Sequence, residues 1–209
     1  MAVPYIIIAI AGYLIGSIPF GFLVAKAKGI DIRNVGSGNI GATNAMRVLG
    51  KPAGIFVLLM DALKGYAACT WLVSLLLKFF MIAPEQVGTL QIVAGIAAVL
   101  GHNYTCWLKF KGGKGIATSA GVFLALAPWA LLIALVVFIF AVLLTRYVSV
   151  GSIAAGAALP AAVWIMTPHN IFLGIVTTAL GLLAIYKHKG NIQRLMAGTE
   201  NRLGGKAKP

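Results

Sequence analysis

Apolar stretches of roughly 18 residues or more recur along the whole length of this chain. Each stretch is long enough to cross a hydrocarbon core about 30 Å thick. Of the 209 residues, 60% are hydrophobic and only 10% are charged, whereas a soluble domain carries about 25% charged residues. The sequence therefore predicts an all-α, polytopic integral membrane protein that forms one membrane-embedded domain over residues 1–209.

Hydropathy and helix-breaking residues divide the chain into about seven transmembrane helices, with short cytoplasmic half-helices or re-entrant loops between them. The stretch 115–147 is too long for one helix and holds Pro128 near its middle, so we divide it into two helices. The predicted spans cover residues 3–25, 53–80, 88–104, 115–127, 129–147, 149–167 and 171–187.

Small residues in the predicted spans indicate closely packed helices. Gly12 and Gly16 lie in the first span, and Gly151 and Gly156 lie in the sixth. Small side chains let two membrane helices bring their backbones together. Pro19 predicts a kink near the cytoplasmic end of the first span.

The basic residues lie mostly on one predicted side of the membrane, in loops 26–52 and 105–115 and in the tail 188–209. With the N-terminus outside, Lys78 is the one basic residue placed outside, and Lys64 lies within a span. The residues placed inside are Lys26, Lys28, Arg33, Arg47, Lys51, Lys109, Lys111, Lys114, Arg146, Lys187, Lys189, Arg194, Arg202, Lys206 and Lys208. The positive-inside tendency therefore predicts a cytoplasmic C-terminus and an N-terminus outside.

The net charge of +13 also limits the partners. Anionic lipids and small anionic substrates both fit, whereas no basic stretch is long enough to follow a nucleic-acid backbone. The first apolar stretch is followed, not preceded, by positive charges, so we interpret it as a retained span and not as a secretory signal. Cys69 and Cys106 have the spacing of neither a disulfide framework nor a metal cluster, and we interpret them as packing residues.

The loop after the first span is rich in glycine and in hydrogen-bonding side chains, and reads VGSGNIGATN over 35–44. Its three glycines match G-x-G-x-x-G, but a membrane span precedes them, so a dinucleotide-binding fold is excluded. Glycines also let backbone donors converge on an anion, and a predicted helix over Ala42–Leu49 directs its N-terminus at the same place. A flexible linker is the less favoured alternative. The predicted phosphate-binding residues are Gly36, Ser37, Gly38, Asn39, Gly41, Thr43, Asn44 and Arg47.

The loop after the third predicted span alternates lysines with glycines directly before a helix, and reads KFKGGKG over 109–115. This pattern surrounds a phosphate with backbone N–H groups, a helix dipole and ammonium charges, although its spacing is not that of a Walker loop. Lys109 and Lys111 also fit a positive-inside or lipid-headgroup role, so Lys114 is favoured as the substrate ligand. The predicted phosphate-binding residues here are Lys111, Gly112, Gly113, Lys114 and Gly115.

Charged residues inside the second span need a partner. Asp61 and Lys64 are three residues apart on one helix face, and charges at membrane depth are usually paired. A structural pair and a catalytic pair both remain open, with structural support at least as well favoured. His102 lies where a span ends, and the sequence leaves its role open as well.

The tail carries a further group of polar residues. His188 and Asn191 share a helix face if the last helix continues through them. Glu200 is one of only four acidic residues in the chain. Paired with Arg194 or Arg202, it is predicted to hold the tail in place.

Familiar catalytic signatures are missing from the sequence. It contains neither G-x-S-x-G, H-E-x-x-H nor the His-x-x-x-x-Asp signature of thioester-dependent glycerolipid acyltransferases. Paired carboxylates that would hold two metal ions are also missing, so metal-dependent phosphoryl transfer is not favoured.

Three segments resemble the motifs of the PlsY family of bacterial inner-membrane acyl-phosphate:glycerol-3-phosphate acyltransferases. They read GSGNIGATN over 36–44 with Arg47, FKGGKGIAT over 110–118, and HKGN over 188–191 with GTE over 198–200. The resemblance implies seven spans and a cytoplasmic active site in the bacterial inner membrane. It also implies transfer of a fatty acyl group from acyl phosphate to the 1-hydroxyl of glycerol 3-phosphate, giving lysophosphatidate and phosphate.

The resemblance also implies roles for individual residues. Ser37 and Arg47 match the catalytic first motif, and residues 112–115, with Lys114, match the glycerol-phosphate-binding loop. His188 and Asn191 match the third motif, where Glu200 is structural. The substrates expected as partners are therefore glycerol 3-phosphate and acyl phosphate, together with membrane lipids.

Acyl phosphate has a good leaving group, so we expect no cofactor, no metal and no covalent enzyme intermediate. Ser37 has no neighbouring base in the sequence and is favoured as a hydrogen-bond donor. The general base is either His188 or the phosphate of glycerol 3-phosphate, whose second pKa is about 6, and we favour the phosphate. A transporter of organic phosphates is the alternative function, but it predicts an internal repeat that we do not find.

Overall fold

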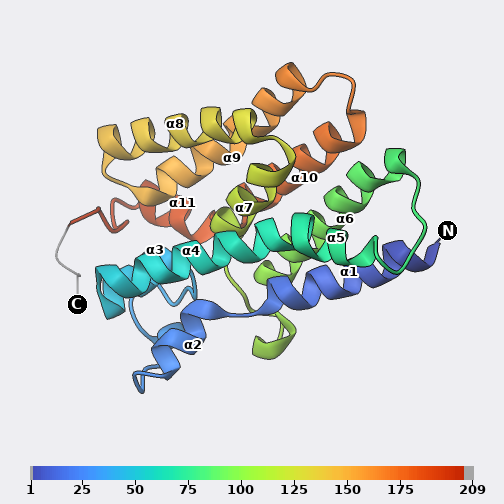
Figure 1. The fold of residues 1–209 in the computed structure, drawn as a ribbon. Coiled ribbons are helices and arrows are strands. Elements are labelled where there is room, and N and C mark those ends of the chain that lie inside the picture. The colour runs from blue at the N-terminus through green and yellow to red at the C-terminus, as the bar shows by residue number, and fades with distance from the viewer. Residues whose placement is uncertain (1, 205–209) are drawn as a thin grey trace. The chain divides into compact units, whose positions relative to one another are not determined.

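The computed structural model describes residues 2–204 and shows an all-helical chain over that range (Figure 1). Lys206 and Lys208, which contribute to the predicted charge bias, lie outside the described residues. The helices cluster into two compact units, residues 1–126 and 127–209. The single domain over residues 1–209 stays a prediction.

Unit 1, residues 1–126, contains both predicted phosphate-binding loops. Short turns of other helix types interrupt its α-helices, including a π-helical turn within the second predicted span. Its elements are α1 (Ala2–Ser17), α2 (Phe20–Lys26), η1 (Ile32–Asn34), α3 (Ala42–Leu49), α4 (Lys51–Ala67), η2 (Ala68–Leu72), α5 (Val73–Leu76), α6 (Pro84–Asn103), η3 (Cys106–Leu108) and α7 (Ile116–Leu126). The short helix predicted over Ala42–Leu49 is confirmed with the same bounds.

Glycines let the helices of unit 1 pack backbone to backbone. A Cβ on Gly12 would lie 3.0 Å from the Ala94 carbonyl oxygen, and one on Gly16 would overlap the backbone of Ala98. This order of contacts shows that α1 and α6 run side by side in the same direction. The close packing predicted for Gly12 and Gly16 is confirmed, and Gly65 makes an equally close approach between α4 and α7.

The kink predicted at Pro19 is confirmed as a complete break between α1 and α2. Proline has no backbone N–H and cannot continue the helical hydrogen-bond ladder. The backbone N–H of Phe20 donates instead to the Ile18 carbonyl oxygen, at 3.2 Å. The ammonium group of Lys64 on α4 also donates to this carbonyl, at 2.8 Å.

Unit 2 contains α8 (Pro128–Thr145), α9 (Val148–Met166), α10 (Ile171–Lys187) and α11 (Lys189–Met196). The helix α9 runs antiparallel to both α8 and α10, and it meets each of them at glycines. A Cβ on Gly151 of α9 would lie 2.9 Å from the Phe138 carbonyl oxygen, and one on Gly181 of α10 would lie 2.5 Å from that of Gly156. The division of residues 115–147 into two helices is also confirmed, because α8 begins at Pro128.

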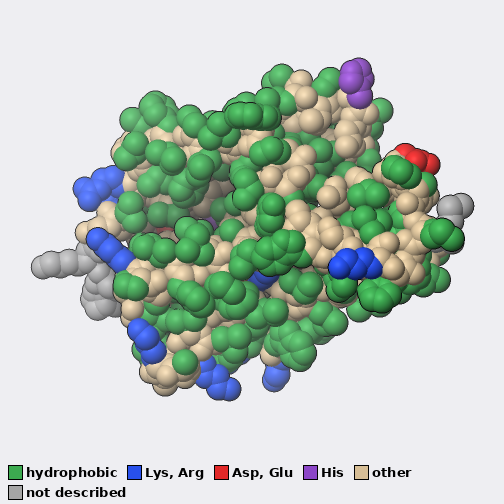
Figure 2. Space-filling view, in the orientation of Figure 1, with side chains coloured by type: hydrophobic (Ala, Val, Ile, Leu, Met, Phe, Trp, Pro, Cys, Tyr) green, Lys and Arg blue, Asp and Glu red, His purple; other side chains and the backbone are tan. Residues whose placement is uncertain are grey.

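Within residues 2–204, four helical segments are long and apolar enough to cross a membrane, and a fifth qualifies if the bent pair α10–α11 is one span. Figure 2 shows hydrophobic side chains covering the visible flanks of α4 and α8, and α8 exposes Val136, Phe140 and Leu143 by 58–72%. Such faces are suited to lipid. The helix α7, with 11 residues, is shorter than a full span, so the number of seven spans stays a prediction.

Candidate active site

The first loop is organised around the buried side chain of Asn44, which is 1% exposed. Its Oδ1 accepts a hydrogen bond from the backbone N–H of Ser37 at 2.8 Å. Its Nδ2 donates to the carbonyl oxygens of Asn39 at 2.9 Å, Val35 at 3.1 Å and Ile32 at 3.3 Å. The polar atoms of this amide are therefore committed to the loop, and a direct phosphate contact from Asn44 stays a prediction.

Two glycines give the loop the backbone shape that this arrangement requires. Gly36 and Gly38 have φ values of +64° and +70°, in the left-handed region that other residues avoid. A Cβ on Gly36 would also overlap Oδ1 of Asn44. Further along, Oδ1 of Asn39 accepts from the backbone N–H of Gly41 at 2.8 Å, so a second side-chain amide also faces the loop.

Of the side chains predicted to bind phosphate in the first loop, Ser37, Thr43 and Arg47 are exposed. Thr43 and Arg47 are four residues apart and therefore lie on one face of α3. Near the loop, the guanidinium of Arg33 hydrogen-bonds Asp31 and lowers the pKa of that carboxyl group to about 2. Arg33 is thus paired with a carboxylate in the folded chain, which favours Arg47 as the guanidinium that meets a phosphate.

Two glycines of the second loop donate their backbone N–H groups to the end of α6. The backbone N–H of Gly113 donates to the His102 carbonyl at 2.9 Å, and that of Gly112 donates to the Asn103 carbonyl at 3.2 Å. A phosphate contact from Gly112 and Gly113 stays a prediction, and in the described chain their two N–H groups cap the C-terminus of α6. The physical reason is that the last carbonyls of a helix lack partners within the helix.

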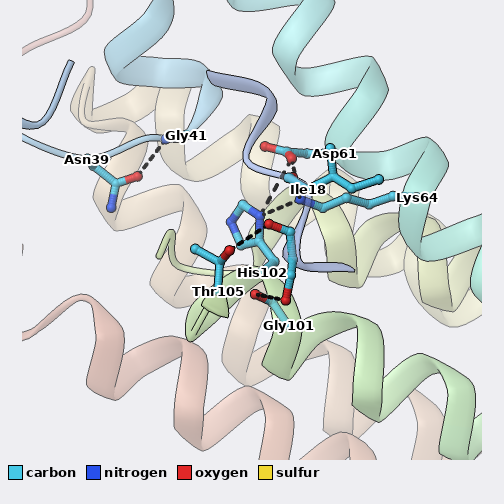
Figure 3. Close-up of polar contacts among 9 residues, drawn as sticks. Ile18, Asn39, Gly41, Asp61, Lys64, Gly101, His102 and Thr105 are labelled. Atoms are coloured by element: carbon cyan, nitrogen blue, oxygen red, sulfur yellow. Dashed lines mark hydrogen bonds and ion pairs between the residues drawn. The ribbon is translucent and has the colours of Figure 1, made fainter. Parts of the chain in front are cut away.

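The other terminal carbonyls of α6 are bound by side chains of α1. The hydroxyl of Ser17 donates to the Gly101 carbonyl at 3.3 Å, and that of Tyr13 donates to the Tyr104 carbonyl at 2.7 Å. In return, the hydroxyl of Thr105 donates to the Ser17 carbonyl at 2.6 Å (Figure 3). These three hydroxyl groups give backbone carbonyls a polar partner, as a low-dielectric surrounding requires.

The two glycines also allow the loop to lie directly on His102. A Cβ on Gly113 would overlap Nε2 of the His102 ring, and one on Gly112 would overlap the His102 carbonyl. Gly115 has a φ of +82°, and its Cβ would lie 2.8 Å from Oδ1 of Asn103. The loop is therefore fixed against the end of α6, and Lys114 projects from a restrained backbone.

The charged pair predicted between Asp61 and Lys64 is confirmed, with Nζ 2.7 Å from Oδ1 and both side chains under 5% exposed. The structure adds a third member that the sequence left open. Nδ1 of His102 lies 3.0 Å from Nζ of Lys64 and 3.5 Å from Oδ1 of Asp61. Figure 3 shows the three side chains converging from α4 and α6.

In unit 2, Glu200 gathers three donors. Its Oε1 accepts from Asn191 Nδ2 at 2.8 Å and from Ser149 Oγ at 3.1 Å, and its Oε2 accepts from Arg194 Nε at 2.8 Å. Of the two arginines considered, Arg194 is therefore the partner. Ser149 is not among the predicted site residues, because its one signal in the sequence is a hydroxyl group next to a predicted span boundary.

His188 lies between α10 and α11, which are bent by 50° at this point, so the last helix does not continue straight. The imidazole is buried, and its Nδ1 lies 2.8 Å from the Ala184 carbonyl oxygen. Because a carbonyl only accepts, Nδ1 carries a proton, and a neutral ring keeps its lone pair on Nε2. That nitrogen can accept a proton or a hydrogen bond from a hydroxyl group.

Within residues 2–204, no three His, Cys, Asp or Glu side chains lie close enough together to hold a metal ion. The chemistry of the described polar residues is that of anion binding: hydroxyl groups, a guanidinium, lysines and an imidazole. They lie on two basic loops of unit 1 and on the α10–α11 bend of unit 2.

Comparison with known proteins identifies the chemistry. Residues 6–198 match the family model for glycerol-3-phosphate acyltransferase. The chain belongs to the glycerol-3-phosphate acyltransferase family. The relative from Geobacter metallireducens is 50% identical over 94% of this chain and 96% of its own length. The relative from Geotalea daltonii is 45% identical, again over 94% and 96%.

Solved structures support the same assignment. The crystal structure of PlsY, an integral membrane glycerol 3-phosphate acyltransferase, in its glycerol 3-phosphate form aligns with a TM-score of 0.85 and 38% identity over 96% of each chain. Its lysophosphatidic acid form aligns with a TM-score of 0.81 and 36% identity, over 95% of this chain and 94% of that one. The resemblance inferred from the three motifs is confirmed, and the chain is a multi-pass integral membrane acyltransferase.

Replacement of Glu200 tests the structural role of the tail cluster. Glu200→Ala leaves three donors without their acceptor, so we expect a loss of about 2 kcal/mol in the free energy of unfolding. In detergent this corresponds to a fall of about 4–8 °C in Tm. Glu85→Ala, which removes an exposed carboxylate from the first turn of α6, is the control and should change Tm by less than about 2 °C. An unchanged Tm for Glu200→Ala would contradict the role.

Proposed function

We propose that this chain transfers a fatty acyl group from acyl phosphate to the 1-hydroxyl of glycerol 3-phosphate, giving lysophosphatidate and inorganic phosphate. The observation that carries the proposal is the match of 95–96% of the chain to PlsY structures in glycerol 3-phosphate and lysophosphatidic acid forms. The exposed Arg47 and the restrained Lys114 loop support it, because both substrates carry phosphate.

In the proposed reaction, the 1-hydroxyl oxygen attacks the acyl carbonyl carbon, and the bond from that carbon to the phosphate oxygen breaks. Arg47 and Lys114 neutralise phosphate charge, and the Ser37 hydroxyl donates a hydrogen bond to the oxygen on which negative charge develops. Asn191, whose Nδ2 donates to Glu200, keeps the catalytic role that the resemblance of the third motif implies. The hydroxyl proton passes to the phosphate of glycerol 3-phosphate, and inorganic phosphate leaves.

The function is tested with purified protein in detergent. We expect phosphate to be released from acyl phosphate only when glycerol 3-phosphate is present, with lysophosphatidate formed in equal amount. A transporter of organic phosphates would bind glycerol 3-phosphate without turnover, so tight binding with no phosphate release would overturn the proposal.

The identity of the base has its own test. If the substrate phosphate takes the proton, His188→Asn should keep the pH-dependent limb of kcat/KM near about pH 6, the second pKa of a phosphate monoester. Loss of that limb would assign the proton to His188 instead. Replacing glycerol 3-phosphate by a phosphonate analogue, with its different pKa, should move the limb in both proteins. If His188→Ala kept its fold and its substrate binding but had a kcat below about one part in 10⁴ of the wild-type value, the substrate phosphate would not be the base.

We also propose that the N-terminus faces outside and that both basic loops and the tail face the cytoplasm of a bacterial cell. In unit 1, Lys28 lies just after α2 and Lys78 lies just after α5, and both side chains are exposed. In a background lacking Cys69 and Cys106, Lys78→Cys should react with a membrane-impermeant maleimide on intact spheroplasts. Lys28→Cys should react only after permeabilisation, and the reverse pattern would invert the orientation.

A further inference from the structure

The ammonium group of Lys64 joins three elements of unit 1 at a single buried point (Figure 3). Its Nζ donates to the Ile18 carbonyl at 2.8 Å, at the break between α1 and α2. It also lies 3.0 Å from Nδ1 of His102 and 2.7 Å from Oδ1 of Asp61. The contact with Asp61 is an ion pair within α4, whereas the contacts with Ile18 and His102 connect α4 to other elements.

This contact fixes the tautomer of His102. An ammonium group has no lone pair and can only donate, so Nδ1 of His102 acts as the acceptor. The proton of the neutral ring therefore lies on Nε2, on the side of the ring against which Gly113 packs. His188 has the opposite arrangement, with its proton on Nδ1.

His102 in turn holds the loop that carries Lys114. Its carbonyl accepts the Gly113 N–H at 2.9 Å, and its ring occupies the space that a side chain at Gly113 would need. Lys114 is the next residue along the chain. A rotation of the His102 ring would therefore move the backbone from which Lys114 projects.

We propose that Asp61, Lys64 and His102 form a positioning network that holds loop 112–115 in one conformation and thereby places Lys114 on the phosphate of glycerol 3-phosphate. The placement of Lys114 on that phosphate rests on the proposed function. Stability alone does not account for the network, because apolar replacements of buried ion pairs are often neutral or stabilising. At membrane depth, buried charges are expensive as well.

The test removes the network without leaving an isolated buried charge. The double variant Asp61→Asn/Lys64→Met has no charged side chain at either position. It also lacks the donor to Nδ1 of His102. We expect KM for glycerol 3-phosphate to rise at least about tenfold, with KM for acyl phosphate within about twofold of wild type. In hydrogen exchange, the amides of Gly112 and Gly113 should exchange at least about tenfold faster, whereas those in the middle of α6 should not change.

A double-mutant cycle with Lys114→Met separates positioning from general support. If the network acts through Lys114, Asp61→Asn/Lys64→Met should raise KM no further once Lys114 is replaced. Multiplicative effects, an equal change in both KM values, or unchanged exchange at Gly112 and Gly113 would each overturn the proposal. If the double variant does not fold, His102→Asn takes its place in the cycle, because its amide oxygen can still accept from Lys64.

The kinetic and the hydrogen-exchange measurements give different results if the network fails and if the proposed function fails. Wild-type protein without turnover in the presence of both substrates would overturn the function. Exchange at Gly112 and Gly113 still reports whether the network holds the loop, because that measurement needs no substrate. Gly88→Ala, for which a Cβ would meet no atom within 4 Å, is the matched control in both measurements.

Discussion

Gly113→Ala should lower kcat/KM for glycerol 3-phosphate by about 100-fold or more. The added Cβ would overlap Nε2 of the His102 ring, and that ring cannot turn aside without breaking its contact with Lys64. The loop must therefore move, and a displacement of about 1 Å in a positioning group costs about 100-fold in rate. Steady-state kinetics with each substrate varied in turn measure the effect.

The control for this substitution is Gly88→Ala in α6, where the added Cβ meets open space. It should leave kcat/KM within about twofold of wild type. Wild-type activity in Gly113→Ala would show that the loop can move without consequence, and that Lys114 is not positioned by its contact with His102.

Asn44→Ala should lower kcat/KM by about 1,000-fold. The substitution removes the acceptor of the Ser37 N–H and the donor to the carbonyls of Asn39, Val35 and Ile32. At about 1 kcal/mol for each hydrogen bond, the loop loses about 4 kcal/mol. If that loss falls on the active conformation of the loop, its population decreases by about 1,000-fold.

Asn44→Asp provides a more selective variant, because it keeps an acceptor for Ser37 and loses the donors. It should also be impaired, since a carboxylate would face three carbonyl oxygens. Asn34→Ala, an exposed position in the turn η1, is the control and should retain activity within about twofold. Activity in Asn44→Ala within tenfold of wild type would contradict the organising role of Asn44.

The sequence allowed much of the fold to be predicted, because the relevant signals are local. Apolar length predicts membrane helices, Pro19 predicts the break between α1 and α2, and Gly12 and Gly16 predict close packing. The helix α3 was also predicted with its observed bounds, because its glycine-rich boundaries at Gly41 and Gly50 are local signals as well.

The details of the candidate site depend on contacts between distant residues, and the sequence could not supply them. A glycine indicates that something approaches the backbone closely, but not whether it is an anion or a helix carbonyl. For Gly112 and Gly113 it is the end of α6. An asparagine in a polar loop can likewise face outward or inward, and Asn44 faces inward.

Ser149 and His102 illustrate the same limit. Each lies at the end of an apolar run, and its partner comes from a segment 51 or 38 residues away. Pairing a hydroxyl with Glu200, or an imidazole with Lys64, requires knowledge of which helices are neighbours. The family resemblance supplied the catalytic motifs, but it gave no role to these two residues.

The contact between Lys64 and the Ile18 carbonyl has a consequence for the order in which the chain enters the bilayer. The Ile18 carbonyl already accepts the N–H of Phe20, and Lys64 already pairs with Asp61 on α4. The contact between the two segments therefore adds a second donor to the carbonyl and a further acceptor to an ammonium group that is costly at membrane depth. A bilayer that already holds α1 should consequently take up α4 more readily, and synthesis from the N-terminus provides the two segments in that order.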